Sequence, residues 1–504
     1  MLKSKSQLLF FLIWFIPILV FAIHFFDFSN FISIISQKTT LNMVVFTLFQ
    51  ALISTVIAFL IAILPSFYAS FNKNFLSKLL SSTLFIPFFF PVISATTTFV
   101  LIGHQKFFHD IHFLFSLKAI IVANVFFNAP IFIYYLKESF SKIPKTLHDL
   151  SVVDGANKNQ FICRVLIPLV TPAIFRSGIL CFAYCFTNFA IILNLGGLKF
   201  STLEVSIATT LLSSYNFSEA FTYGFIQLII LSTLFYFISS QSSHENEIEQ
   251  VVSLKTTYIT TIISVLFCLF EFAIVALSLI FSFYNFYLGT FSLLPFKELF
   301  SLNFNQEYPV LLSFFTTVAL SFVTSIITVI VVYFIIKSKT RFTNFFLFST
   351  LGISNAFLAI CLIYLNILYN IPIPILLVLG YLIIATPIAY AFISPHFESF
   401  PKNIVESAYL SGANRLKLFL YIEWPILKSI FIATFLQIFT IIFGEFTLTY
   451  TMQIYSTLPT LSLTTYMLSS SHNLANASAL SGISLFFIII LYFLSLSFIN
   501  RFKN

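Results

Sequence analysis

The stretch Asp149-Leu-Ser-Val-Val-Asp-Gly-Ala-Asn157 returns 257 residues later in the chain as Glu406-Ser-Ala-Tyr-Leu-Ser-Gly-Ala-Asn414. The same offset joins further pairs on both sides of these stretches, namely Pro130 with Pro387, Pro144 with Pro401, Lys145 with Lys402, Pro168 with Pro425 and Phe189 with Phe446. A single offset that carries three prolines and a Gly-Ala-Asn triplet is hard to obtain by chance in so apolar a chain. The sequence therefore predicts a tandem duplication of one structural unit.

The composition is typical of a protein that lies in a lipid bilayer. Of the 504 residues, 59% are hydrophobic and 8% are charged, and the mean hydropathy is +1.01. A spanning helix needs roughly 20 apolar residues. Runs of about this length predict twelve spans, at residues 8–26, 43–70, 82–103, 118–136, 173–194, 221–239, 258–284, 309–336, 344–368, 375–394, 429–450 and 479–500. The expected fold class is an all-α polytopic membrane protein with about twelve transmembrane helices in two six-helix repeats.

Lysines and arginines set the expected orientation, because positive charge near helix ends is held on the cytoplasmic side. With both termini placed in the cytoplasm, the outer loops keep only a minority of the 25 lysines and arginines, which are Lys38, Lys106, Lys118, Lys199 and Lys297. The net charge of +8 is explained by this topology. It is therefore not interpreted as a sign of nucleic-acid binding.

The most polar internal stretch lies between the sixth and seventh predicted spans and predicts a cytoplasmic linker at residues 241–255. Residues 1–240 then form the first six-helix half and residues 256–504 the second. Since both halves begin on the same side, they are expected to be parallel copies related by an axis along the membrane normal. A transport pathway is expected at their interface.

Each half contains one long cytoplasmic loop between its fourth and fifth spans, at residues 137–172 and 395–428. Two short helices are expected to meet at a glycine, which adopts the left-handed turn that other residues resist. An acidic residue is expected near the start of the first short helix, where negative charge is favoured, and a proline is expected to redirect the chain before it re-enters the bilayer. The residues in these three roles are Gly155 and Gly412, Asp149 and Glu406, and Pro168 and Pro425.

Both loops resemble the EAA loop of bacterial ABC importer permeases, E-A-A-x3-G-x9-I-x-L-P. The loop is the coupling helix of that family, so the resemblance implies that one chain with two loops engages two copies of an ATP-binding subunit. It also implies the type I permease fold, a multi-pass location in the bacterial inner membrane, and a periplasmic substrate-binding protein as a partner. Asp149-Leu-Ser and Glu406-Ser-Ala depart from the triplet, and Trp424 stands where leucine is usual, so the two interfaces are expected to differ in strength.

The chain contains no G-x-x-x-x-G-K-[ST] phosphate loop, and no glycine is followed by lysine. ATP and Mg²⁺ are therefore expected on the partner subunits. The chain itself is expected to be a transport subunit, in contact with membrane lipid, that has neither catalytic residues nor a cofactor or metal of its own.

Three stretches resemble the corresponding segments of thiamine permeases: Asn124-Val-Phe-Phe-Asn-Ala-Pro130, Cys185-Phe-Thr-Asn-Phe-Ala-Ile-Ile-Leu-Asn-Leu-Gly-Gly197 and Thr202-Leu-Glu-Val-Ser-Ile-Ala208. This resemblance favours thiamine or its phosphate esters as the solute. Ferric-iron permeases share the fused plan of two halves and remain the alternative.

Glu445 is an ionisable residue within the eleventh predicted span, and such residues usually face a cavity or a partner. Its counterpart at the 257-residue offset is Asn188. A carboxylate and an amide facing each other across the halves would line the path of a cation, which suits thiamine. An interhelical hydrogen bond or a protonated packing role for Glu445 remains equally open. Iron would prefer several oxygen ligands, and no such intramembrane cluster is visible.

Other polar residues carry weaker expectations. Glu271, in the seventh span, is expected to make a polar contact within the helix bundle, and His104, His109 and His112 are expected to be solvated in an outer loop rather than to bind metal. A rival interpretation is a secondary transporter driven by an ion gradient, which also uses repeated halves but would need more ionisable residues in its spans. A membrane scaffold without transport is a second rival.

Overall fold

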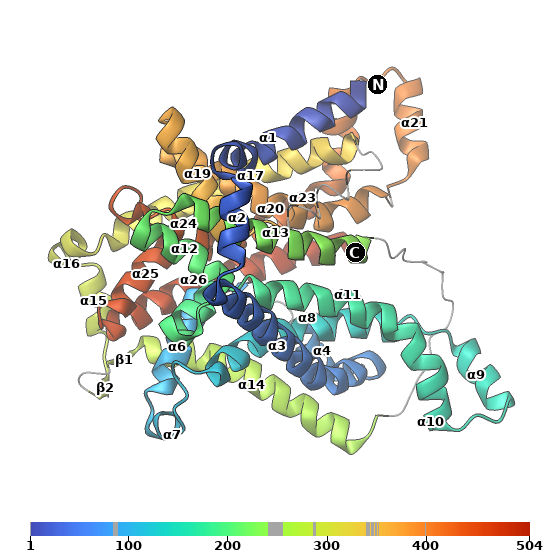
Figure 1. Ribbon diagram of the computed structural model, residues 1–504. Helices are drawn as coiled ribbons and strands as arrows, with labels where there is room; N and C mark the ends of the chain where they lie inside the picture. The colour runs from blue at the N-terminus through green and yellow to red at the C-terminus, as the bar shows by residue number, and fades with distance from the viewer. Residues whose placement is uncertain are drawn as a thin grey trace.

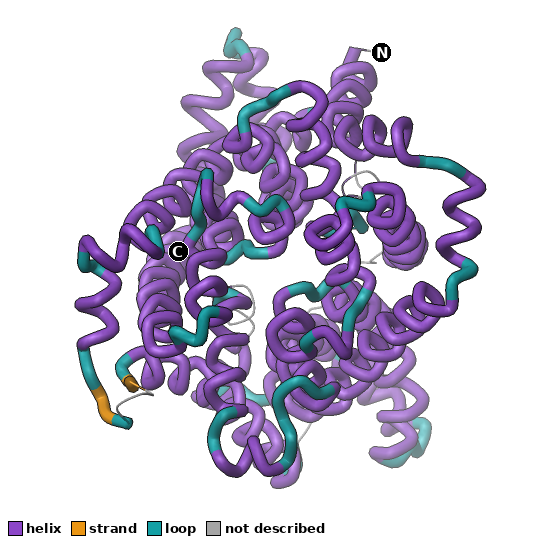
Figure 2. The backbone as a smooth tube through the Cα atoms, turned by 60° about the vertical axis from the view of Figure 1, so that its left-hand side comes forward, coloured by secondary structure: helices purple, strands orange, loops and turns teal. Residues whose placement is uncertain are grey.

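The computed structural model describes residues 2–83, 89–239, 256–285, 289–338, 343, 347, 350, 352–398 and 400–503. Helices make up almost all of this part of the chain, and the strands form one short pair at an edge (Figure 2). Long apolar runs form helices here because a helix satisfies every backbone polar group within its own segment, as a lipid environment requires. The protein is an all-α polytopic membrane protein. The predicted linker at residues 241–255 lies outside the described residues.

The described residues of the first half form twelve α-helices, labelled as in Figure 1. In chain order they are α1 (Leu2–Phe25), α2 (Phe28–Ile35), α3 (Lys38–Phe71), α4 (Phe75–Thr83), α6 (Val92–Gly103), α7 (Lys106–Asp110), α8 (Leu117–Phe140), α9 (Lys145–Val153), α10 (Lys158–Phe161), α11 (Ile167–Phe186), α12 (Leu203–Ser214) and α13 (Phe217–Ser239). Two π-helical turns, η1 (Ile162–Leu166) and η2 (Ile192–Gly196), and a 3₁₀ turn, η3 (Leu198–Phe200), lie between them.

The second half repeats this order, with α14 (Tyr258–Ser282), α15 (Leu294–Leu299), α16 (Leu302–Glu307), α17 (Val310–Lys337), α19 (Asn355–Tyr369), α20 (Ile373–Glu398), α21 (Lys402–Leu410), α22 (Arg415–Leu418), α23 (Trp424–Phe443), α24 (Thr447–Thr451), α25 (Leu461–Ser470) and α26 (Leu474–Lys503). The π-helical turn η4 (Phe419–Glu423) and the 3₁₀ turn η5 (Ile454–Ser456) belong to it. Strands β1 (Tyr284–Asn285) and β2 (Thr290–Phe291) pair antiparallel, with Tyr284 opposite Phe291.

Each of the twelve predicted spans coincides with a helix in the described residues. Nine helices there are long and apolar enough to cross a membrane, and a tenth span forms if α1 and α2, which meet at 92°, are counted as one. The remaining two predicted spans, 82–103 and 344–368, overlap the shorter apolar helices α6 and α19, and their residues 84–88, 344–346, 348, 349 and 351 lie outside the described residues. These two are the third predicted span of each half.

Two predicted spans end earlier than expected, at equivalent places. The fifth was expected to run to residue 194 and the eleventh to residue 450, but α11 ends at Phe186 and α23 at Phe443. Each helix is followed by a break of a few residues and then by a short helical turn. Long apolar runs lie on both sides of these breaks, Thr187-Asn-Phe189 and Gly444-Glu-Phe446, so hydropathy averaged over a span does not reveal them.

The halves exchange their first helices. Helix α1 packs against α19 of the second half, and the equivalent α14 packs against α6 of the first half. At the centre, the rings of Phe189 and Phe446, which are counterparts at the 257-residue offset, lie 5.9 Å apart. Both chain ends and the loops that contain α9 and α21 lie toward the right of Figure 1, and β1, β2, α15 and α16 lie toward the left. The repeated loops therefore project from the same end of the molecule.

Candidate functional site: two elbows and a cavity between the halves

The two long loops form elbows with the same backbone, which we name the first elbow (residues 144–168) and the second elbow (residues 401–425). In the first elbow, the N–H groups of Gly155 and Ala156 donate to Val152 O and Ser151 O, at 3.0 and 2.9 Å. The second elbow makes the equivalent two bonds, both at 3.0 Å. This pattern is the Schellman motif, in which the residue after the helix must be left-handed. Gly155 and Gly412 meet this need with φ of +77° and +79°.

Asparagine starts the second short helix in both elbows. Asn157 Oδ1 accepts from Gln160 N at 2.9 Å, and Gln160 Oε1 accepts from Asn157 N at 2.9 Å, which makes a reciprocal capping box. Asn414 Oδ1 accepts from Lys417 N at 2.8 Å, but lysine cannot return the bond. The Gly-Ala-Asn triplet thus ends one helix and begins the next.

A π-helical turn then joins each second short helix to the span that follows. Ile167 N donates to Ile162 O, and Trp424 N donates to Phe419 O, five residues back in each case. Pro168 and Pro425 come immediately after these donors. A proline ring clashes with the carbonyl four residues before it, and the wider π turn moves that carbonyl aside. The prolines were expected to redirect the chain, but each elbow runs on without a break into the next span, through α10, η1 and α11 in the first half and through α22, η4 and α23 in the second.

The acidic residues do not stand where the sequence placed them. Asp149 and Glu406 are the fifth residues of nine-residue helices, and the first turn of α9 and of α21 contains no acidic residue. The expectation that they favour the helix start is therefore wrong. Both side chains are exposed at the surface. The third residue of each triplet, Ser151 or Ala408, is buried in its elbow, with 9% and 8% exposure, so a small side chain is required there.

Both elbows present an apolar tip. Val153 is 83% exposed and Leu410 is 90% exposed, and within the described residues these are the two most exposed large apolar side chains. They are counterparts at the 257-residue offset, and each lies two residues before the left-handed glycine. Exposed apolar side chains in the same place on two copies indicate a surface that meets a partner.

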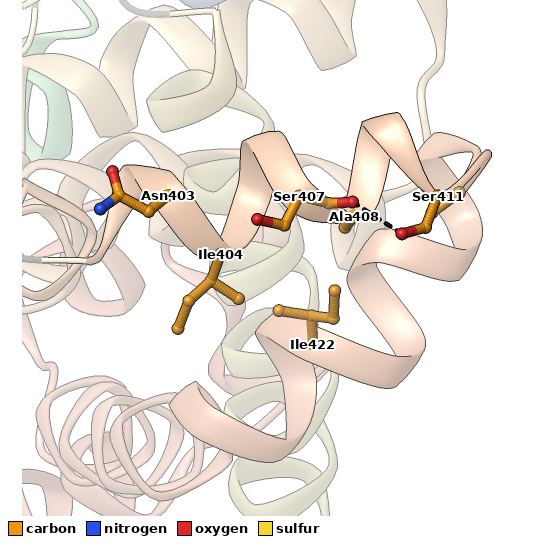
Figure 3. A pocket seen from close by; sticks show the side chains of 7 residues that line it. Asn403, Ile404, Ser407, Ala408, Ser411 and Ile422 are labelled. Carbon is orange, nitrogen blue, oxygen red and sulfur yellow. Dashed lines mark hydrogen bonds between the residues drawn. The ribbon is translucent and has the colours of Figure 1, made fainter.

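Beneath the tip, the second elbow contains an open groove of about 530 Å³ between α21 and the π turn η4. Figure 3 shows Ile404 of α21 and Ile422 of η4 on the two sides of this space. Ser411 Oγ donates to Ser407 O at 2.9 Å along its edge. The groove exists because the side chains that face it are short or branched.

Asn188 and Glu445 lie at the two breaks in the spans and cap the short helical segments that follow. Asn188 Oδ1 accepts from Ile191 N at 3.2 Å, and Glu445 Oε1 accepts from Leu448 N at 2.8 Å. The two residues therefore share one local role, which the sequence analysis did not foresee for Glu445. Glu445 Oε2 is buried and has no hydrogen-bond partner in the described part of the chain.

Both residues line the same cavity of about 280 Å³ between the halves. The rest of its wall combines aromatic rings and small polar side chains with aliphatic residues such as Ile131, Ile388 and Ile441. Aromatic residues on it are Phe89, Phe90, Phe127, Tyr184, Phe189 and Phe446, and polar ones are Asn128, Thr187, Asn355, Thr440 and Thr447. Glu445 is the charged residue among the described residues of this lining. The structure thus brings the two predicted pathway residues to one site.

The hydrogen bonds that hold Asn188 and Glu445 in place differ between the halves. Asn188 Nδ2 donates to Asn124 Oδ1 at 3.2 Å, and Asn124 Nδ2 donates to Gln50 Oε1 and Ser54 Oγ at 3.2 and 3.1 Å. This amide chain connects α3, α8 and the first break. In the second half, the counterpart of Asn124 is Tyr381, whose ring is buried. The first half therefore holds its cavity residue by a hydrogen-bonded amide network, and the described residues of the second half show no equivalent network.

Glu204 is a structural residue that the sequence analysis quoted but did not single out. It lies in α12 with no exposed surface, accepts from Gln227 Nε2 at 2.6 Å, and accepts from Ala356 N of the second half at 3.0 Å. A carboxylate is favourable there because the N–H groups at the start of α19 lack helical partners. Its counterpart is Leu461, so the 257-residue offset could have marked Glu204 as a departure from symmetry.

The remaining polar residues do not join these sites. Glu271 is fully buried in α14, and neither of its oxygens has a hydrogen-bond partner in the described residues, so the expected polar contact is not seen there. His104, His109 and His112 are exposed around α7. No group of three His, Cys, Asp or Glu side chains within the described part of the chain lies close enough to hold a metal ion.

Comparison with known proteins connects this geometry to a transport family. Residues 55–243 match the family model of the binding-protein-dependent transport system inner membrane component. The matched segment contains the first elbow, Asn188 and Glu204. The second elbow and Glu445 lie beyond it, in the half that repeats the same elements. The similarity to this family therefore covers the part of the chain that contains the first elbow and the first of the two cavity residues.

Several curated permeases are similar to parts of the chain. The thiamine transport system permease protein ThiP of Haemophilus influenzae is 27% identical over 135 residues, which are 27% of this chain and 25% of ThiP. The trehalose/maltose transport system permease protein MalG of Thermococcus litoralis is 29% identical over 101 residues, 20% of this chain and 34% of MalG. The probable transport system permease protein NifC of Clostridium pasteurianum is 26% identical over 138 residues, 27% of this chain and 48% of NifC. The matches thus span from a quarter to about half of these relatives.

Proposed function

We propose that this chain is the membrane-spanning permease subunit of an ATP-driven ABC importer that moves thiamine, or its phosphate esters, from the periplasm to the cytoplasm. The observation that carries the proposal is the path from each elbow to the cavity. Each elbow exposes an apolar tip and continues through a π turn into α11 or α23, and each of these helices ends at a break that lines the shared cavity. A push on either tip therefore has a continuous helical route to the space between the halves.

In this proposal each elbow is a coupling loop that docks on one of two ATP-binding subunits. Asp149 and Glu406 are exposed on the docking helices, the left-handed Gly155 and Gly412 set the angle of each elbow, and Pro168 and Pro425 follow the π turns. ATP and Mg²⁺ bind to the partner subunits, whose closure draws the two elbows together. The elbows and both chain ends lie toward one end of the molecule, which supports a cytoplasmic location for all of them in the bacterial inner membrane.

A periplasmic substrate-binding protein delivers the solute at the opposite end in this scheme. That end contains α7 and the β1, β2, α15 and α16 segment of the second half. Glu298 of α15 accepts from Asn476 Nδ2 of α26 at 3.0 Å, which ties this segment to the last span. The segment therefore offers an anchored surface at the mouth of the pathway.

The lining of the cavity supports a cationic solute. Glu445 supplies a carboxylate oxygen without a partner, and the surrounding rings offer faces that attract a cation. Thiamine is a cation with two aromatic rings, and one of the similar permeases is named for thiamine transport. Other similar permeases are named for trehalose or maltose and for 2-aminoethylphosphonate. A phosphonate group is an anion and would meet the Glu445 carboxylate, not a positively charged side chain. The lining therefore favours thiamine over a phosphonate.

Ferric iron is the alternative solute, because fused two-half permeases of the same plan transport it. A hard cation prefers several oxygen ligands, and Glu445 stands with amides and hydroxyls on the described cavity wall. A secondary transporter driven by an ion gradient is the alternative from another class. It predicts transport without an ATP-binding partner, whereas the exposed elbow tips favour a partner.

Two experiments test the proposal. The chain is purified from its native membrane in mild detergent, and an ATP-binding subunit is expected to co-purify. Absence of this subunit together with ATP-independent uptake would favour the secondary transporter.

The second experiment compares uptake of labelled thiamine and of ferric iron in a deletion strain that carries either the wild-type chain or a Gly178→Ala control. Restored thiamine uptake supports the proposed solute, and restored iron uptake alone contradicts it.

A further inference from the structure

The base of the second elbow contains a buried charged group that the elbow geometry does not require. Glu423, the last residue of η4, has a side chain that is 1% exposed. Its Oε1 pairs with the Nζ of Lys337 at the end of α17, and its Oε2 accepts from the Tyr333 hydroxyl at 2.8 Å. Both carboxylate oxygens are therefore satisfied by α17, a helix that is 86 residues away in sequence.

Aromatic rings surround this ion pair. Lys337 Nζ lies 5.4 Å from the ring centre of Phe397 and 5.7 Å from that of Tyr333. The Tyr333 ring in turn lies 5.0 Å from Phe419 of η4. The Glu423 carboxylate is buried under these rings, whereas the Lys337 side chain is 37% exposed. The pair and its rings join three elements, namely α17, the end of α20 and the π turn.

The first elbow has an apolar base at the equivalent place. The counterpart of Glu423 is Leu166, which is buried with 3% exposure. The counterpart of Phe397 is Phe140, whose ring centre lies 5.7 Å from that of Phe67 and 6.2 Å from that of Phe71. Apolar packing is non-directional, whereas an ion pair with a hydrogen bond fixes both distance and direction. The two elbows thus share a tip but not an attachment.

We propose that Lys337, Glu423 and Tyr333 are positioning residues that lock the second elbow to the end of α17, so that α17 and α23 move together when this elbow moves. Among the described residues, the first elbow shows no such ion pair at its base and can shift over its apolar packing. The functional part of this inference rests on the proposed function. The second half then transmits the motion of its ATP-binding subunit through α17 and α23 as one rigid unit, which we call the lever. The first half transmits it through apolar packing that can shift. Because α23 ends two residues before Glu445, the lever acts on the side of the cavity that contains this carboxylate.

The lock itself is tested without any partner. Hydrogen–deuterium exchange is measured on the full chain in lipid nanodiscs, for peptides over residues 415–424 and 158–167. Lys337→Met leaves the Glu423 carboxylate buried without its cation, and exchange in 415–424 is expected to rise at least about tenfold, with 158–167 unchanged. The double variant Lys337→Met with Glu423→Leu copies the apolar base of the first elbow and is expected to return exchange to within about threefold of the wild type.

The matched control is Lys142→Met, which breaks the exposed pair between Lys142 and Glu138 at 3.6 Å and is expected to leave both peptides unchanged. Unchanged exchange in Lys337→Met overturns the lock. A double variant that exchanges as fast as the single variant also overturns it, because the effect would then come from lost packing and not from the pair.

The lever is tested in proteoliposomes with the co-purified ATP-binding subunits and binding protein, by the ratio of thiamine taken up to ATP hydrolysed. Lys337→Met is expected to lower this ratio about tenfold while ATP hydrolysis persists, and Tyr333→Phe about threefold, because it removes one of the two bonds to the carboxylate. An unchanged ratio in a chain whose 415–424 exchange has risen overturns the lever. If the wild-type chain shows no ATP-dependent uptake of any solute, the proposed function fails, and the exchange experiment still decides the lock.

Discussion

The two elbows are nearly identical at their tips and differ at the points where they meet the rest of the protein. Both end α9 and α21 with the same Schellman bonds, and both pass through a π turn of five residues. Their bases are apolar in one half and charged in the other. The helices beyond them end two residues before Asn188 in the first half and two residues before Glu445 in the second. Two equal tips suit two copies of one partner. A cavity that holds a single solute between unlike halves has no reason to remain symmetric.

The largest effect is expected when the left-handed turn that both elbows share is removed. Proline cannot adopt a φ near +77° and lacks the N–H that Gly155 donates to Val152 O. The double variant Gly155→Pro with Gly412→Pro is expected to lower ATP-dependent uptake by roughly 100-fold or more, since each site loses on the order of 3 kcal/mol. Uptake into cells or proteoliposomes measures the effect.

The control for that experiment is Gly178→Ala, because a Cβ at this position in α11 meets nothing within 4 Å. It is expected to keep uptake within about twofold of the wild type. Normal uptake in the double proline variant would contradict the coupling role of the elbows. The two single proline variants then show whether the halves contribute equally.

The next effect concerns the contact that only one half makes. Glu204→Leu copies the residue at the equivalent position, Leu461, and leaves Ala356 N and the Gln227 amide without their acceptor. A loss of about 2–4 kcal/mol in folding free energy is expected, because two buried donors become unpaired. Thermal unfolding in detergent measures it. Glu204→Gln retains an acceptor and should lose less; equal losses in the two variants would show that the hydrogen bonds do not matter.

A smaller effect is expected at the cavity. Glu445→Gln retains a side-chain oxygen that can accept from Leu448 N but removes the negative charge, so thiamine uptake is expected to fall about tenfold with folding unchanged. The reciprocal variant Asn188→Asp adds a carboxylate to the other side of the same cavity. It is expected to restore part of the uptake in the Glu445→Gln background. Wild-type uptake in Glu445→Gln would remove this residue from the pathway.

The smallest effect is expected at the tips. Leu410→Ser and Val153→Ser each replace a side chain that contacts little within the chain, so folding should not change. Each is expected to weaken binding of the ATP-binding subunit by about five- to tenfold, from roughly 1 kcal/mol of lost apolar burial. Binding is measured by titration of the detergent-solubilised chain. Unaltered affinity in both variants would show that the partner docks elsewhere.

Features that depend on neighbouring residues followed from the sequence. The twelve apolar runs, the left-handed turns at Gly155 and Gly412 and the repeat itself all appear in the structure, because hydropathy and glycine conformation act within a few residues. The place of Asp149 in its short helix was wrong by about one turn. Helix ends are hard to predict here because Pro144 stands before the helix as its N-cap, and the helix begins one residue later.

The sequence by itself determined the membrane class, the duplication, the elbows and the two candidate residues Asn188 and Glu445, since each of these rests on composition, spacing or local backbone geometry. Only the tertiary structure decided that those two residues share one cavity, that Glu204 spans 152 residues to reach Ala356, and that Glu423 pairs with Lys337. The physical reason is distance along the chain. A hydrogen bond to the next helical turn is set by the residues around it, whereas a bond between separate helices forms only where packing brings them together.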